Sequence, residues 1–141
     1  MKVLFDTNVI LDALMKRAPF FETASQLMAQ AERHDIEGVL GATTVTTLYY
    51  LLAKHLGKVA AEHHVQLLMH LFSVAPVNTS VIEMALAAKA HDFEDAVLFC
   101  AAAHIHCDAI VTRNIKDFKG SAVPVYQPDE LLTILLNRSS M

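Results

Sequence analysis

Short apolar segments alternate along the chain with longer segments in which apolar residues recur at helical spacing. The short segments have the length and composition of strands, and they cover residues 2–5, 38–42, 71–77, 109–112 and 123–126. Because helical segments separate them, we expect the strands to pair in parallel, with helices as the crossover connections. The pattern therefore predicts an α/β fold with a parallel sheet of about five strands, flanked by helices.

The helical segments carry residues that start and stop helices. We expect helices over residues 8–16, 20–34, 43–56, 59–70, 79–91, 94–106 and 128–136. Thr79 or Ser80 is expected to cap one of them, Gly57 to end another, and Pro128 to begin the last. Since no linker, repeat or low-complexity tract interrupts the series, the sequence predicts a single domain over residues 1–141.

The composition bears on the partners of the protein. Apolar residues make up 54% of the 141 residues, and the mean hydropathy of +0.37 is high for a soluble monomer of this size. We therefore expect a partner chain to cover part of the surface. The net charge of −4 argues against a generally basic nucleic-acid binder, but bound divalent cations would offset several of the acids.

Neither the apolar segments nor the cysteines indicate export or membrane contact. The apolar segments are shorter than a membrane span, and Asp6 interrupts the N-terminal one too early for a signal peptide. Cys100 and Cys107 are too few for a disulfide framework and fit free thiols in a reducing compartment. We therefore expect a cytoplasmic protein without membrane contact.

Acidic and amide side chains follow the predicted strands or begin the helix that leads into one. They are Asp6 and Asn8 after the first strand, Asn114 and Asp117 after the fourth, and Glu94 and Asp95 at the start of the helix before the fourth. Parallel strands bring such positions to one edge of a sheet, where ligands bind. Converging carboxylates repel one another and are tolerated beside a cation. A hard divalent metal ion that handles phosphates is the natural candidate.

Three segments resemble the motifs of the PIN domain family. They are Phe5-Asp6-Thr7-Asn8-Val9-Ile10-Leu11-Asp12, Glu94-Asp95-Ala96 before an Ala-rich helix, and Thr112-Arg113-Asn114-Ile115-Lys116-Asp117-Phe118. The motifs stand in family order over the whole chain, and they look most like a subgroup with Asp-Phe-Glu-Asp-Ala and Thr-Arg-Asn-x-Lys-Asp-Phe. The resemblance implies a three-layer PIN-like fold and hydrolysis of RNA phosphodiester bonds with Mg²⁺ or Mn²⁺. It also implies a VapC-type toxin, with an antitoxin protein and a homodimer as expected partners.

The resemblance assigns roles to individual residues. It places catalytic carboxylates at Asp6, Asp95 and Asp117. It implies a metal ligand set of Asp6, Glu94, Asp95, Asn114 and Asp117. It implies substrate contacts from Asn8, Thr112, Arg113 and Lys116, with the Thr112 hydroxyl orienting the acids. Lys54 and Lys58 would extend a basic track, whereas we expect Lys119 to be a solvated charge.

Two positions depart from the family pattern. The family places a Glu early in the helix after the second strand, where this chain has Thr47. Many relatives also have Asp at the position of Asn114. The site therefore loses two negative charges, and Glu94, next to Asp95, is expected to restore charge.

Several residues have a structural interpretation beside the functional one. For Asp92 we favour a helix cap over metal ligation. For Asp12 a structural hydrogen bond to a basic residue near the cleft and a direct role are equally open. Tyr49 and Tyr50 are expected to pack on the two sides of their helix. A further group lacks zinc-finger spacing and is expected to consist of buried thiols and helix-end histidines: Cys100, His104, His106 and Cys107.

Three function classes remain open from the sequence. The leading one is a metal-dependent endoribonuclease that cleaves single-stranded or structured RNA as the toxin of a toxin–antitoxin module. The second is a catalytically weak PIN module that binds RNA or a protein, which the Thr47 position motivates. The third is a phosphatase or phospho-receiver domain, whose expected Asp and Lys placement this chain matches poorly.

Overall fold

Five parallel strands form one sheet in the spatial order β3-β2-β1-β4-β5. The computed structural model describes residues 1–139. Its strands are β1 (Lys2–Phe5), β2 (Glu37–Gly41), β3 (Ser73–Ala75), β4 (Ala109–Val111) and β5 (Val125–Tyr126). All four neighbouring pairs are parallel. The expected parallel sheet is therefore confirmed.

Helices connect the strands, as the hydrophobic spacing predicts. They are α1 (Thr7–Leu14), α2 (Phe21–Glu32), α3 (Ala42–Leu56), α4 (Lys58–Leu71), α5 (Thr79–Ala88), α6 (Phe93–His104) and α7 (Pro128–Ser139). A short 3₁₀ helix, η1 (Ile115–Phe118), follows β4 and was not expected from the sequence. Its four residues are too few to show a helical apolar period.

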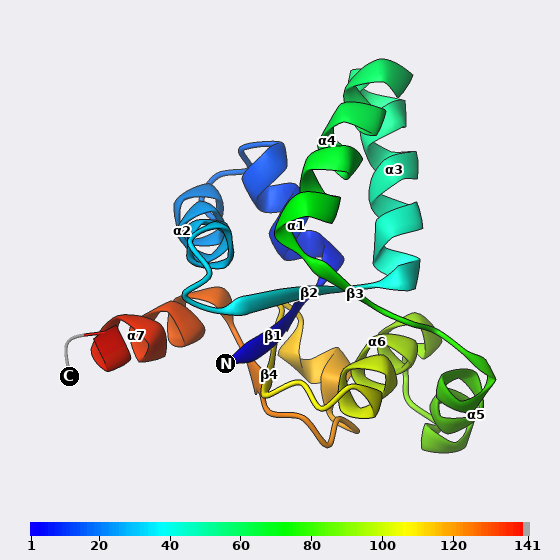
Figure 1. Cartoon of the computed structure of the whole chain (residues 1–141). Coiled ribbons are helices and arrows are strands. Elements are labelled where there is room, and N and C mark those ends of the chain that lie inside the picture. The colour runs from blue at the N-terminus through cyan, green and yellow to red at the C-terminus, as the bar shows by residue number, and fades with distance from the viewer. Residues whose placement is uncertain (140–141) are drawn as a thin grey trace.

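The alternation of side chains along β1 separates two hydrophobic cores. Val3 and Phe5 are buried in one core, and Leu4 between them is buried in the other. Residues from α1, α2, α3, α4 and α7 complete the first core, and residues from α5 and α6 complete the second. Figure 1 shows α1 to α4 above the strands and α5 and α6 below them. The chain therefore has the expected three-layer α/β architecture.

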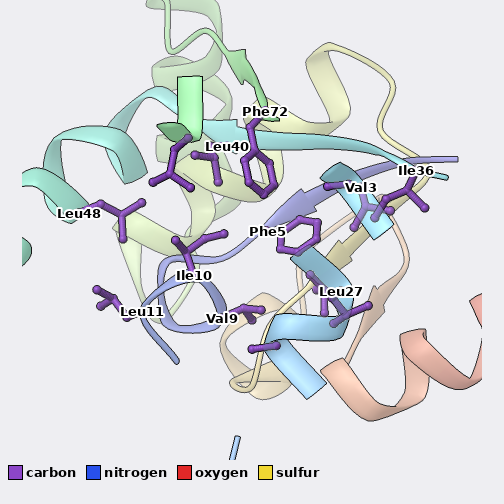
Figure 2. Close-up of a cluster of buried hydrophobic side chains, with 14 of the residues drawn as sticks. Val3, Phe5, Val9, Ile10, Leu11, Leu27, Ile36, Leu40, Leu48 and Phe72 are labelled. Atoms are coloured by element: carbon purple, nitrogen blue, oxygen red, sulfur yellow. The ribbon is translucent and has the colours of Figure 1, made fainter. Parts of the chain in front are cut away.

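The first core is centred on an aromatic pair. The rings of Phe5 and Phe72 meet edge to face, with centroids 5.2 Å apart, and Figure 2 shows them between Leu40 and Val3. A Cβ atom at Gly38 would lie 2.6 Å from the Phe72 ring. Glycine is therefore required at this position of β2 for Phe72 to reach Phe5.

The strand order reverses at β1, in the centre of the sheet. From β1 the chain adds β2 and β3 on one side, and then β4 and β5 on the other. The backbone N–H of Asp6 donates to the carbonyl oxygen of Val111 at 3.0 Å, which joins the ends of β1 and β4. The crevice beyond these two strand ends is the usual ligand position in a sheet of this kind.

Two local expectations were wrong. Asn78, and not Thr79 or Ser80, caps α5, since its Oδ1 accepts from the backbone N–H of Val81 at 3.0 Å. Tyr49 packs against the first core, but Tyr50 is 65% exposed.

Within residues 1–139, every helix is too short or too polar to cross a bilayer.

Candidate active site

The carboxylate of Asp6 is held at the end of β1 by three hydrogen-bond donors. It caps α1, with Oδ1 accepting from the backbone N–H of Thr7 at 2.8 Å. Its Oδ2 accepts from the hydroxyl of Thr112 at 2.7 Å and from the side-chain amide of Asn8 at 3.2 Å. Because Asp6 is only 6% exposed, these neutral donors fix its position but leave its charge uncompensated.

Thr112 lies behind Asp6 and not on the surface of the site. Its side chain is fully buried, and its hydroxyl also accepts from the backbone N–H of Asn114 at 3.0 Å. The Asn8 carbonyl oxygen accepts from the backbone N–H of Arg113 at 3.4 Å. Thr112 and Asn8 therefore tie the end of β1 to the segment after β4, and the hydroxyl of Thr112 orients Asp6 as expected.

The N-terminus of α6 brings three more carboxylates to the same edge. Asp92 caps this helix, as we favoured, with Oδ1 accepting from the backbone N–H of Asp95 at 3.0 Å. Glu94 and Asp95 stand in its first turn. On the other side, η1 supplies Asp117.

These side chains line one cleft of about 280 Å³. The expected residues among its lining are Asp6, Asn8, Thr47, Asp92, Glu94, Asp95, Asn114 and Asp117. Thr47 faces the cleft from α3, the helix in which the family places its Glu. The structure therefore brings together all five residues of the expected ligand set.

Burial, together with the charges of neighbouring acids, raises the pKa values of two of these carboxylates. Burial raises the pKa of Asp95 from 3.8 to about 7, and the charges of Asp6, Asp92, Asp117 and Glu94 add to that effect. Burial also raises the pKa of Asp6, although the hydrogen bonds from Thr112 and Thr7 oppose the change. The cleft is therefore an electrostatically strained acidic site that a cation would relieve.

Three residues expected at the substrate do not line the acidic cleft: Arg113, Lys116 and Thr112, which is buried behind Asp6. Arg113 donates from Nε to Asp12 at 2.6 Å and from Nη2 at 3.2 Å, and its guanidinium lies 4.0 Å from the ring centre of Phe20. Of the two open interpretations of Asp12, the structure therefore shows the structural hydrogen bond. Lys116 lines a neighbouring pocket with Arg113 and does not line the acidic cleft.

Sequence reasoning missed Arg17, the one basic residue among residues 1–139 that lines the acidic cleft. Arg17 lies in the loop after α1, and its Nη1 is 3.9 Å from Asp12 Oδ1. Its backbone N–H donates to the Asp12 carbonyl oxygen at 3.0 Å, so the chain folds back over the end of the helix. No spacing in the sequence indicates this placement. Thr43 and Thr44 of α3 also line the cleft.

The donors in the cleft fit a hard divalent cation. They are carboxylate, amide and hydroxyl oxygens, and the lining within residues 1–139 includes no thiol or imidazole. Across those residues, no three His, Cys, Asp or Glu side chains converge closely enough to form a ready-made ligand set. The buried thiols of Cys100 and Cys107 lie in the second core.

Comparison with known families matches this arrangement. Residues 2–116 match the PIN domain family, and the match includes β1, the N-terminus of α6 and the first part of η1. The chain belongs to the PIN domain family. No curated protein matches this PIN domain in sequence.

Solved structures share the fold of this PIN domain. A chain of FitAcB from Neisseria gonorrhoeae superposes with a TM-score of 0.73 at 23% identity, and the match covers 89% of this chain and 97% of that one. A chain of VapBC2 from Rickettsia felis, bound to a promoter DNA fragment, gives 0.69 at 15% identity, with 90% and 98% covered. VapC20 from Mycobacterium tuberculosis, a toxin that cleaves the sarcin-ricin loop, gives 0.63 at 16% identity, with 77% and 86% covered.

Proposed function

We propose that this PIN domain is a metal-dependent endoribonuclease. The observation that carries the proposal is the cleft at the reversal point of the sheet, which five carboxylates line and where the pKa of Asp95 rises to about 7. Such a site favours a divalent cation, and cations of this kind handle phosphates. The fold is shared with VapC20, which is described as a toxin that cleaves the sarcin-ricin loop.

The carboxylates of Asp6, Asp95 and Asp117 would hold Mg²⁺ or Mn²⁺, with Glu94 and the Asn114 carbonyl as further ligands. When bound, the ion lowers the pKa of water and neutralises charge on the phosphate. The chain itself fixes Asp6 through Thr112, whose hydroxyl donates to Oδ2 at 2.7 Å.

The basic residues next to the cleft would bind the RNA backbone. Lys116, Lys119 and Arg113 line the neighbouring pocket, and Asn114 lines both that pocket and the acidic cleft. A phosphate next to the scissile one would therefore meet a positively charged wall. This placement supports Lys119 as a substrate contact, beyond the solvated charge that we expected.

We also propose that the protein acts as a toxin inhibited by an antitoxin and forms a homodimer. VapBC and FitAB assemblies share its fold, and exposed apolar residues such as Val59 and Tyr50 on the α3–α4 hairpin offer surface for a partner. Residues 1–141 would form one domain, since α7 contributes Leu131 and Leu135 to the first core. We place this domain in the cytoplasm.

A catalytically weak binding module is the second candidate. It is favoured by Thr47 and Asn114, which line the cleft where the family has carboxylates. In that case the cleft would bind RNA or a protein without turnover.

Cleavage of a labelled single-stranded RNA mixture in Mg²⁺ or Mn²⁺ tests these alternatives. Wild type is compared with Asp95→Asn, with added EDTA, and with Asp35→Asn, which removes an exposed carboxylate far from the cleft lining. We expect cleavage by wild type and Asp35→Asn, and a loss of at least a hundredfold in Asp95→Asn and in EDTA. Binding of RNA by folded wild type without any cleavage would replace the enzyme with the binding module.

A further inference from the structure

A second pocket lies beyond the basic one and has a different chemistry. It encloses about 350 Å³ between the loop before α2 and the start of α7, within the range of roughly 300–1,000 Å³ typical of small-ligand sites. Its walls are an aromatic ring, a guanidinium and polar side chains, together with two prolines: Pro19, Phe20, Thr23, Arg113, Gln127, Pro128 and Asp129.

The pocket has a flat, rigid platform. The Arg113 guanidinium lies 4.0 Å from the Phe20 ring centre, and Phe20 remains 40% exposed. The side chain of Arg113 is fixed in this position, because it donates two hydrogen bonds to Asp12, which is 1% exposed. An aromatic ring backed by a fixed guanidinium is the kind of surface on which a nucleobase stacks.

Charge distinguishes this pocket from its basic neighbour. In the neighbouring pocket, Lys116 and Lys119 supply the net positive charge, so a phosphate is favoured there. In the Phe20 pocket, Asp12 already balances the charge of Arg113, and Asp129 adds a carboxylate. A phosphate would be repelled by Asp129, whereas a neutral base is not.

The polar residues of the pocket match the edge of a base. Gln127 is exposed, and its side-chain amide makes no hydrogen bond to residues 1–139, so it is free to donate and accept. The Asp129 carboxylate accepts from an amino or ring N–H group, such as those of guanine. Arg113 and Gln127 line both pockets. Together with Asn114, they make one continuous path from the acidic cleft to Phe20.

From these contacts we infer that the Phe20 pocket binds one nucleobase of the RNA substrate, with Phe20 and Arg113 as the stacking platform and Gln127 and Asp129 as readers of the base edge. The inference rests on the proposed ribonuclease function and names a specificity site for it. Guanine is bound in preference to uracil, because its adjacent ring N–H and amino group can donate to both oxygens of Asp129, whereas uracil offers a single ring N–H.

Binding of short RNAs tests the pocket separately from catalysis. Fluorescently labelled nine-nucleotide single strands, one of uridine only and others with a central adenosine, cytidine or guanosine, are titrated in Ca²⁺, which takes the same oxygen ligands as Mg²⁺. We expect Phe20→Leu to weaken binding about tenfold through loss of one stack, and Phe20→Tyr to restore it. Asp129→Asn and Gln127→Ala are expected to reduce the preference for guanosine over uridine several-fold.

Matched variants outside the pocket serve as controls. Leu86→Ala removes another exposed apolar side chain, and Gln66→Ala another exposed amide, and both should bind as wild type does. Equal binding by wild type and Phe20→Leu, or no RNA binding at all, overturns the base pocket. Weakened binding by Phe20→Leu in a protein that cleaves no RNA keeps the base pocket and overturns the nuclease proposal. Cleavage of RNA at the wild-type rate by Phe20→Leu and Gln127→Ala keeps the nuclease proposal and overturns the base pocket.

Discussion

Asp6 and Asp12 are two buried carboxylates on the same short stretch of chain, yet they have opposite surroundings. Asp12 pairs with Arg113 through two hydrogen bonds and has Arg17 at 3.9 Å. Asp6 has only neutral donors and faces the other acids of the cleft, and its pKa is raised mainly by burial. The chain supplies a cation for the structural acid. For the acid in the cleft it supplies only orientation, which leaves the charge for an external cation.

The largest effect is expected at the compensated acid. Asp12→Ala leaves Arg113 without its partner and should lower the free energy of unfolding by about 3 kcal/mol. Asp35→Ala breaks the exposed pair with Arg33, whose atoms are 3.2 Å apart, and should cost under about 1 kcal/mol. Urea unfolding of both variants measures the difference. Equal losses would show that burial of the Asp12 pair does not matter.

The next effect concerns the residue that orients Asp6. Thr112→Val keeps the shape of the side chain but removes the hydroxyl that donates to Asp6 Oδ2 and accepts from Asn114 N–H. We expect RNA cleavage to fall roughly 10- to 100-fold, because Asp6 loses its shortest hydrogen bond. Thr112→Ser retains the hydroxyl and should keep most of the activity. Similar losses in both variants would assign the effect to packing.

The uncompensated acids should destabilise the metal-free protein as the pH rises. Folding raises the pKa of Asp95 from 3.8 to about 7, so the folded state binds more protons than the unfolded state between these values. The free energy of unfolding in EDTA should therefore fall from pH 5 to pH 8. Asp95→Asn should flatten this slope and add about 1 kcal/mol at pH 8, a value reduced for partial exposure.

Thermal melts across this pH range, with and without Mg²⁺, check the prediction. Added Mg²⁺ should stabilise wild type more than Asp95→Asn, since the variant lacks one carboxylate ligand. An Asp95→Asn variant that is less stable than wild type in EDTA at pH 8 would contradict the view that burial and repulsion make the charged Asp95 carboxylate destabilising.

The smallest effect is expected from restoring the acid of the family. Thr47 lines the cleft, so Thr47→Glu adds a sixth carboxylate there. We expect tighter Mn²⁺ binding by several-fold and a slightly lower melting temperature in EDTA, because the new charge strengthens both the attraction and the repulsion. Thr47→Gln is the control, because its side chain has the size of Glu but carries no charge. Isothermal titration with Mn²⁺ measures the difference, and equal affinities would rule out the charge as the cause.

Local pattern was sufficient for the elements and for the members of the acidic cleft. The strands and helices follow from apolar periods of two and about three to four residues, which each segment expresses by itself. Asp6 caps α1, which follows β1, and Asp92 caps α6, which leads into β4. Parallel pairing of β1 and β4 alone therefore predicts that the two acids meet at one edge of the sheet. The motif resemblance added the identity of the acids, and the family match confirms that resemblance.

Only the tertiary structure decided which acids are compensated. The bond between Asp6 and Thr112 joins residues 106 positions apart, and that between Asp12 and Arg113 joins residues 101 positions apart. The sequence by itself determined the α/β elements and the acids at the strand ends, because these depend on neighbours along the chain. The packing of β1 beside β4 decided that Arg113 compensates Asp12 and leaves the cleft acidic, because ion pairing depends on distance in space.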